Sequence, residues 1–184
     1  MVLDIEREEA EAFLRSHGVF PLEKVRADLA CSLDETKRKR LHEVRSELGP
    51  LEEVIMQMPL IKRLQRLKQL GGKVNPQKVS PSPLPLLPAF HTRYEHSRLI
   101  VELGKAAGVQ LGLPTKDIAY LMMGGWFHDV GHSAFSHCGD EFLIRNGLPD
   151  HEQRGENYIR DNPEIRKPLE QHDINVERII GVIK

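Results

Sequence analysis

Apolar residues in this 184-residue chain recur three and four positions apart, and no segment of useful length alternates between apolar and polar residues. A repeat of 3.6 residues is typical of amphipathic helices, whereas a half-buried strand has a period of two. The longest helical patterns cover residues 94–112 and 115–132, and shorter ones cover 35–48, 136–147 and 151–161. The sequence therefore predicts an all-α fold, with a mostly aliphatic core because only 5% of the residues are aromatic.

Prolines and glycines mark the expected ends of several helices. Pro59 divides the apolar pattern of residues 51–70 into two short helices, or marks the fresh start of one. The Gly49–Pro50 pair is expected to close a charged helical lead-in, residues 1–50. The proline-rich stretch at 73–88 cannot be helical, and we expect it to form a long loop.

Composition argues against several classes of partner. The net charge of −1 gives no general attraction to nucleic acid or to a membrane surface, and the basic run at 36–39 is flanked by glutamates, as expected of a solvated helix face. The longest apolar run, 118–127, is too short to span a bilayer, and the acidic start of the chain does not resemble a signal peptide. Cys31 and Cys138 fit neither a disulfide framework nor a zinc site, so we expect a cytoplasmic protein.

Six of the nine histidines fall within one third of the chain: His91, His96, His128, His132, His137 and His151. Any one of them alone is more often a hydrogen-bonded core residue than a ligand. Together with nearby carboxylates, however, they offer the imidazole and carboxylate groups that hold divalent metals. The joint pattern therefore favours a metal site.

In the segment at 115–132, the pair His128–Asp129 directly follows an apolar helical pattern. Thr115 is a predicted N-cap, and Gly131 is a predicted helix end. If the helix runs that far, His128 and His132 lie four residues apart on one face, and Asp129 can reach the same cavity from the helix end. Such groups need a partner or a metal when they are buried.

Three ordered motifs carry a family resemblance. They are H-x-R-x-E-H at 91–96, H-D-x-G-H-x-x-F-S-H at 128–137 and H-E-Q at 151–153, and the segment at 63–72 precedes them. Together they resemble the HD-domain superfamily, in particular its deoxynucleoside triphosphate triphosphohydrolases, the dGTPase-like branch. The resemblance covers roughly residues 55–160.

This resemblance implies an HD-domain helical bundle over residues 51–184 and a catalytic divalent metal, which could be Mn, Mg, Fe or Zn. Three of its protein ligands would be His96, His128 and Asp129. Members of the branch take a fourth ligand from an aspartate beyond the H-E-Q helix. Asp173 is the only nearby candidate for it, and the His-Asp doublet that contains it is interpreted as surface. We therefore expect the chain to be incomplete at its C-terminus.

The resemblance also implies how substrate would be held. Arg93 would bind substrate phosphate, a task that suits a guanidinium fork. Gln69, with Leu70 beside it, would lie near the sugar 3′-hydroxyl. The substrate would be a deoxynucleoside triphosphate, and homo-oligomers are expected because enzymes of this branch commonly form them.

The remaining motif residues would act on the triphosphate and the leaving group. By the same resemblance, His132 and His137 would line the triphosphate side, and His151 with Asp140 would protonate the departing 5′-oxygen. An imidazolium oriented by a carboxylate suits that role because an alkoxide leaves poorly without a proton. Two alternatives remain open: another HD phosphohydrolase, such as a nucleotide phosphatase or phosphodiesterase, and a non-catalytic nucleotide-binding module.

Overall fold

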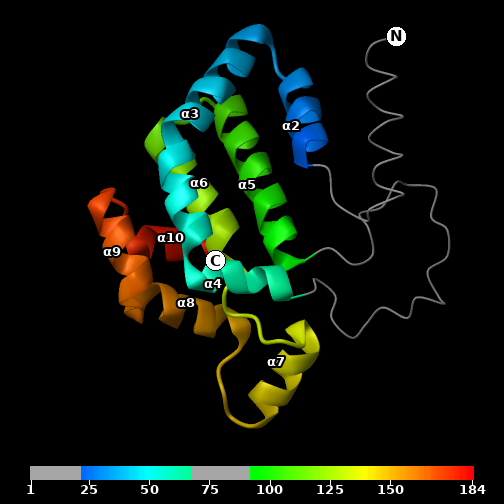
Figure 1. The fold of residues 1–184 in the computed structure, drawn as a ribbon, viewed down its shortest axis with the longest axis vertical. Helices are drawn as coiled ribbons and strands as arrows, with labels where there is room; N and C mark the ends of the chain where they lie inside the picture. Colours follow the sequence, from blue (N-terminus) through cyan, green and yellow to red (C-terminus); the bar gives the residue numbers. More distant parts are fainter. Residues whose placement is uncertain (1–21, 68–91) are drawn as a thin grey trace, which may run out of the picture.

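The computed structural model describes residues 22–67 and 92–184 (Figure 1). Every regular element in these two ranges is a helix, which confirms the predicted all-α fold. The elements are α2 (Leu22–Cys31), α3 (Glu35–Gln57), α4 (Pro59–Arg63), η1 (Leu64–Arg66), α5 (Arg93–Gln110), α6 (Thr115–Phe127), α7 (Ser136–Arg145), α8 (His151–Asp161), α9 (Pro163–Gln171) and α10 (Val176–Ile183).

Some sequence predictions fall on residues that lie outside the described ranges. They concern the first part of the charged helical lead-in, residues 1–21, the proline-rich loop at 73–88, and the side chains of Gln69, Leu70 and His91. The side chain of His137 is likewise not described. Within the ranges that are described, no helix combines the length and the apolar character needed to cross a membrane.

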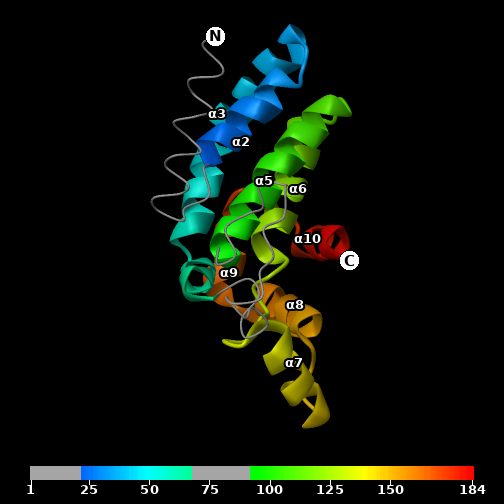
Figure 2. The same ribbon diagram turned by 90° about the vertical axis from the view of Figure 1, so that its right-hand side faces the viewer.

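Helices α5 and α6 lie side by side at the centre of the fold in both views (Figures 1 and 2). Nearly all of the second half of α6 is buried, including Met122, Met123, Trp126 and Phe127, so this half of the helix is apolar all round. Gly125 allows the close approach, because a Cβ atom at this position would lie 2.9 Å from Val101 Cγ2 and 3.0 Å from the Val101 backbone nitrogen.

Two helix boundaries differ from the sequence prediction. Gly49–Pro50 does not end a helix, because α3 continues through it to Gln57. Leu48, Leu51 and Ile55 are buried on the core face of α3, and their packing outweighs the hydrogen bond that Pro50 cannot donate. The break at Pro59 is confirmed, since this residue begins α4. The division of the chain at residue 50 stays a prediction.

The start of α6 also differs. Pro114 occupies the N-cap position and Thr115 is the first helical residue, so the prediction of Thr115 as the cap was wrong. The Thr115 hydroxyl instead accepts a hydrogen bond from Arg40 Nη2 at 2.5 Å and donates one to Glu47 Oε2 at 3.1 Å. A threonine that could cap α6 therefore joins it to α3.

A buried cluster of charges attaches α2 and α3 to α5. The carboxylate of Glu102 is 1% exposed and pairs with Arg26 Nη2 at 3.1 Å and Arg45 Nη2 at 2.8 Å. Lys105, one turn further along α5, pairs with Glu102 and with Glu52. Burial alone would raise the pKa of Glu102, but the surrounding cations outweigh it and lower the pKa. The charged helices that precede α4 are thus held to the central helix by ion pairs.

The tight packing of α5 on α6 gives a stability prediction. Gly125→Ala should lower the free energy of unfolding by about 1–3 kcal/mol, because the added methyl group meets backbone and forces the helices apart. Gly104→Ala is the matched control, since its Cβ would make an ordinary 3.5 Å contact with Leu121 and a helix favours alanine. Urea unfolding measures both, and equal stabilities of the two variants would contradict this account of the packing.

Candidate metal centre and catalytic site

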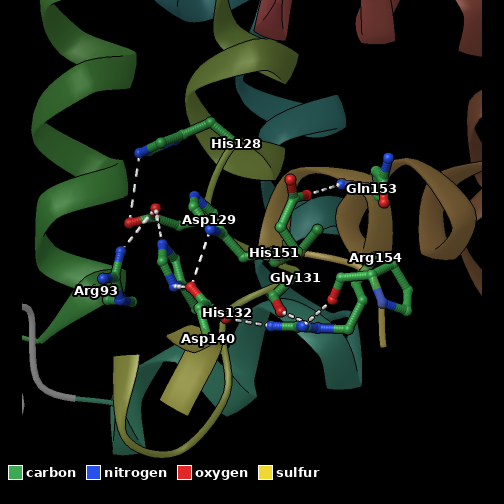
Figure 3. Close-up of polar contacts among 12 residues, drawn as sticks. Arg93, His128, Asp129, Gly131, His132, Asp140, His151, Gln153 and Arg154 are labelled. Atoms are coloured by element: carbon green, nitrogen blue, oxygen red, sulfur yellow. Dashed lines mark hydrogen bonds and ion pairs between the residues drawn. The ribbon is translucent and has the colours of Figure 1, made fainter. Parts of the chain in front are cut away.

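The carboxylate of Asp129 lies at the centre of the site and is buried (Figure 3). Arg93 Nη1, from the first residue of α5, lies 2.7 Å from Asp129 Oδ1. His128 Nε2 is 3.4 Å from Oδ2, and His132 Nε2 is 3.4 Å from Oδ1. Burial raises the pKa of Asp129, but the contacts with His128 and His132 and the charge of Arg93 outweigh burial and hold the pKa far below its usual range. The carboxylate is therefore ionised, as a metal ligand must be.

The turn that carries Asp129 is not helical. Helix α6 ends at Phe127, so the prediction that His128 and His132 share one helix face, with the helix ending at Gly131, was wrong. Arg63 explains the difference, because its guanidinium donates to the carbonyls of Val130 (2.6 Å) and His132 (2.9 Å) and holds the backbone in a turn. The turn sends His132 to a different group of residues from His128.

The N-terminus of α5 is fixed by a capping box. The hydroxyl of Thr92 accepts from the backbone N–H of Glu95 at 3.2 Å, and the Glu95 carboxylate accepts from the backbone N–H of Thr92 at 2.7 Å. The glutamate of the H-x-R-x-E-H motif therefore begins the helix. Arg93 and His96 lie three residues apart on that helix, so both can face the turn that follows α6.

A first group of possible metal ligands consists of His96, His128 and Asp129, whose ligand atoms all lie within 4.8 Å of one another. The two imidazole rings meet edge to face with their centroids 5.2 Å apart. His128 Nδ1 lies 2.9 Å from the carbonyl oxygen of Gly125, so Nδ1 donates there and Nε2 is left to bind a metal. Two imidazoles and one ionised carboxylate suit a divalent ion, and these residues can hold one.

A second group consists of His132, Asp140 and His151. His132 Nδ1 lies 3.2 Å, and His151 Nδ1 2.9 Å, from Asp140 Oδ2, and the two rings stack with centroids 3.9 Å apart. Burial lowers the pKa of His132, and the charge of Arg93 adds to this effect while Asp129 opposes it. Since His132 also contacts Asp129, it joins the two groups (Figure 3).

The glycine of the H-D-x-G-H motif lets the turn lie against the start of α8. A Cβ atom on Gly131 would come within 1.8 Å of the carbonyl oxygen of His151 and 2.6 Å of the backbone nitrogen of Gly155. Any side chain would push α8 away from the turn. His151 is thus held at a fixed place relative to Asp129 and His132.

The structure brings together most of the residues singled out in the sequence, although their functional roles stay predictions. Asp173 lies outside the site, because its side chain is 91% exposed and pairs with Lys116 at 2.6 Å. The carboxylate of this second His-Asp doublet is therefore on the surface, as the sequence predicted. Among the described residues, no fourth histidine, cysteine or carboxylate joins the group of His96, His128 and Asp129.

Sequence reasoning missed two arginines. Arg63 holds the turn, and Arg154 pairs with Asp140 while donating to the Gly131 carbonyl at 3.0 Å. Arg63 opens the segment at 63–72 that was noted beside the motifs, and Arg154 directly follows H-E-Q. For both arginines, the signal in the sequence was their position next to a motif.

Comparison with known proteins shows which family the chain belongs to. The family model of the HD domain matches residues 93–183, which contain both groups of site residues. The chain belongs to the HD-domain superfamily. It is 32% identical to deoxynucleoside triphosphate triphosphohydrolase SAMHD1 of Homo sapiens over 154 residues, which is 75% of this chain and 23% of that protein.

Another relative supports the same branch. The deoxyguanosinetriphosphate triphosphohydrolase-like protein of Clostridium tetani is 31% identical over 94 residues, covering 51% of this chain and 26% of that protein. The predicted resemblance to the triphosphohydrolase branch is confirmed. The chain spans about a quarter of the length of these two relatives.

The first group gives a prediction for metal binding. Purified protein should contain a divalent metal that Asp129→Ala and the isosteric Asp129→Asn both remove, because each loses the ionised ligand. Asp173→Asn serves as the control, since that carboxylate lies on the surface. Elemental analysis, with circular dichroism to verify folding, measures the outcome. Equal metal in folded wild-type protein and Asp129→Asn would refute the ligand assignment.

Proposed function

We propose that this HD domain hydrolyses deoxynucleoside triphosphates to a deoxynucleoside and inorganic triphosphate. The observation that carries the proposal is the pairing of two adjacent groups with different chemistry. One has the ligand types of a divalent metal site, and the other has two imidazoles on one carboxylate. Metal-dependent hydrolysis of a phosphate ester uses both a metal-assisted water and a proton for the leaving oxygen.

The substrate class rests on the relatives. The human and Clostridium tetani proteins carry names that describe cleavage of deoxynucleoside triphosphates or of deoxyguanosine triphosphate. We extend that substrate class to this chain. A cytoplasmic location and a homo-oligomeric assembly stay predictions from the sequence.

In the proposed mechanism, a divalent ion held by His96, His128 and Asp129 would supply Lewis acidity and an activated water near neutral pH. Arg93 keeps the Asp129 carboxylate ionised and oriented. Its guanidinium also suits phosphate oxygens, because planar N–H donors match their geometry. Gln69 and Leu70 are retained as predicted neighbours of the sugar.

Protonation of the leaving 5′-oxygen is assigned to the second group of residues, which contains Asp140 and His151. Asp140 lies 2.9 Å from His151 Nδ1, which fixes the ring so that Nε2 can donate a proton to the 5′-oxygen. As the bond between that oxygen and the α-phosphorus breaks, the oxygen takes the proton and the nucleoside leaves neutral. His132 and His137 are assigned to the triphosphate side.

A non-catalytic nucleotide-binding module is the second candidate. It is favoured by one observation: the described residues bring three protein ligands together, and Asp173, the predicted source of a fourth, lies elsewhere. Such a module would bind metal and nucleotide without turnover. The other HD phosphohydrolases differ from the leading proposal in their products.

Product identity tests the proposed reaction. With dGTP or dATP and Mn²⁺ or Mg²⁺, ion-exchange chromatography should find triphosphate and deoxynucleoside. His151→Ala should reduce turnover by about 10² to 10⁴, the usual contribution of general acid catalysis, and should leave bound metal unchanged. His172→Ala on the exposed doublet is the control and should retain activity. Pyrophosphate or stepwise phosphate release would contradict the triphosphohydrolase, and binding without turnover would favour the non-catalytic module.

Arg93 gives a separate prediction for substrate affinity. Arg93→Lys should weaken binding of a deoxynucleoside triphosphate by about 1–3 kcal/mol, because the charge remains while the planar fork is lost. Arg98→Lys, on the same helix, is the matched control; Arg98 contacts the ring of Tyr94. Calorimetric titration with a non-hydrolysable analogue measures affinity, after metal content has been equalised. Unchanged affinity of Arg93→Lys would make Arg93 a partner of Asp129 alone.

A further inference from the structure

Arg154 connects three segments around the second group. It lies on α8, three residues after His151, and its side chain is 16% exposed. The guanidinium pairs with Asp140 Oδ1, donates from Nε to the Gly131 carbonyl at 3.0 Å, and donates from Nη1 to the Pro149 carbonyl (Figure 3). One side chain therefore contacts three segments: the turn after α6, helix α7 and the loop before α8.

The two oxygens of Asp140 have separate partners. Oδ1 pairs with Arg154, while Oδ2 lies 2.9 Å from His151 Nδ1 and 3.2 Å from His132 Nδ1. Rotation of the carboxylate would break the contact with Arg154, so the guanidinium fixes which oxygen faces the imidazoles. A hydrogen bond between two charged groups is stronger than one between neutral groups.

The apolar side chains of helix α7 contribute little to placing Asp140. It stands away from the α5–α6 pair in both views (Figures 1 and 2). Among the side chains of α7 that the structure describes, Asp140 alone is buried, and Phe142 is 67% exposed. Apolar packing therefore contributes little to the position of this carboxylate, and the ion pair with Arg154 must supply much of it.

We propose that Arg154 is a positioning residue for proton donation: it orients Asp140, which in turn orients His151 toward the leaving 5′-oxygen. The inference rests on the proposed function of this same site. Arg154 does not touch substrate in this account. Its removal should therefore impair the proton-transfer step and leave binding of metal and nucleotide intact.

The kinetic test uses Arg154→Gln and Arg154→Lys in the full chain. Arg154→Gln should lower kcat for dGTP by about 10- to 100-fold, the usual effect of losing a residue behind a reacting group, with KM and metal content unchanged. Arg154→Lys should recover part of the loss because the ion pair survives. Arg160→Gln is the control: Arg160 lies on the same helix and pairs with Glu156 and Glu177 at the surface.

Two further measurements separate positioning from general destabilisation. In the double variant His151→Ala/Arg154→Gln, the second change should add no further loss, because Arg154 acts through His151. With a 5′-thio analogue of dGTP, the bond from the α-phosphorus to sulfur breaks and a thiolate leaves without needing a proton. The Arg154→Gln defect should then shrink to less than about threefold. Additive losses, or an undiminished defect with the thio analogue, would overturn the inference.

A spectroscopic test is independent of turnover. In ¹⁵N NMR, the neutral form of the His151 ring should carry its single proton on Nδ1 in wild type and in Arg160→Gln, and should lose that tautomer preference in folded Arg154→Gln. An unchanged ring in Arg154→Gln would overturn the inference even in a protein that releases no triphosphate. If the wild type shows no triphosphate release but Arg154→Gln alters the ring, the proposed function fails while the positioning by Arg154 stands.

Discussion

The buried carboxylate of Asp129 determines how α5 and the turn after α6 must meet. A charge in this position costs several kcal/mol unless partners compensate it. Arg93 on α5 supplies the countercharge at 2.7 Å, and His128 and His132 each contact the carboxylate at 3.4 Å. Helices α5 and α6 must therefore pack closely, and α6 must end just before Asp129. Gly125 satisfies the first requirement and Arg63 the second.

The same arrangement divides the chemistry between two groups. His96, His128 and Asp129 provide the ligand types of a metal site, whereas His132 and His151 share the carboxylate of Asp140. The turn after α6 makes this division possible, because both histidines contact Asp129 but His128 lies beside His96 whereas His132 lies beside Asp140 and His151. A continuous helix would have placed both imidazoles on one face. The division is what allows metal binding and proton donation to be assigned to different residues.

Much of the fold could be predicted because helical periodicity is a local property of the sequence. The helices at α5, α6, α7 and α8 follow from it, as does the break at Pro59. The passage of α3 through Pro50 and the end of α6 at Phe127 could not be predicted, since tertiary packing and the contacts of Arg63 decide them. Most site residues were found because short motifs group them. The contacts of Arg154 were missed because its partners come from three separate segments.

We assign metal binding to one of the two groups and proton donation to the other. Crystals grown with Mn²⁺ and measured at the manganese absorption edge would locate the ion directly. We expect an anomalous peak at about 2.0–2.3 Å from ligand atoms of His96, His128 and Asp129, with none between His132, Asp140 and His151. A peak bonded to the second group would contradict this assignment, because His151 would then be a ligand and could not serve as the acid.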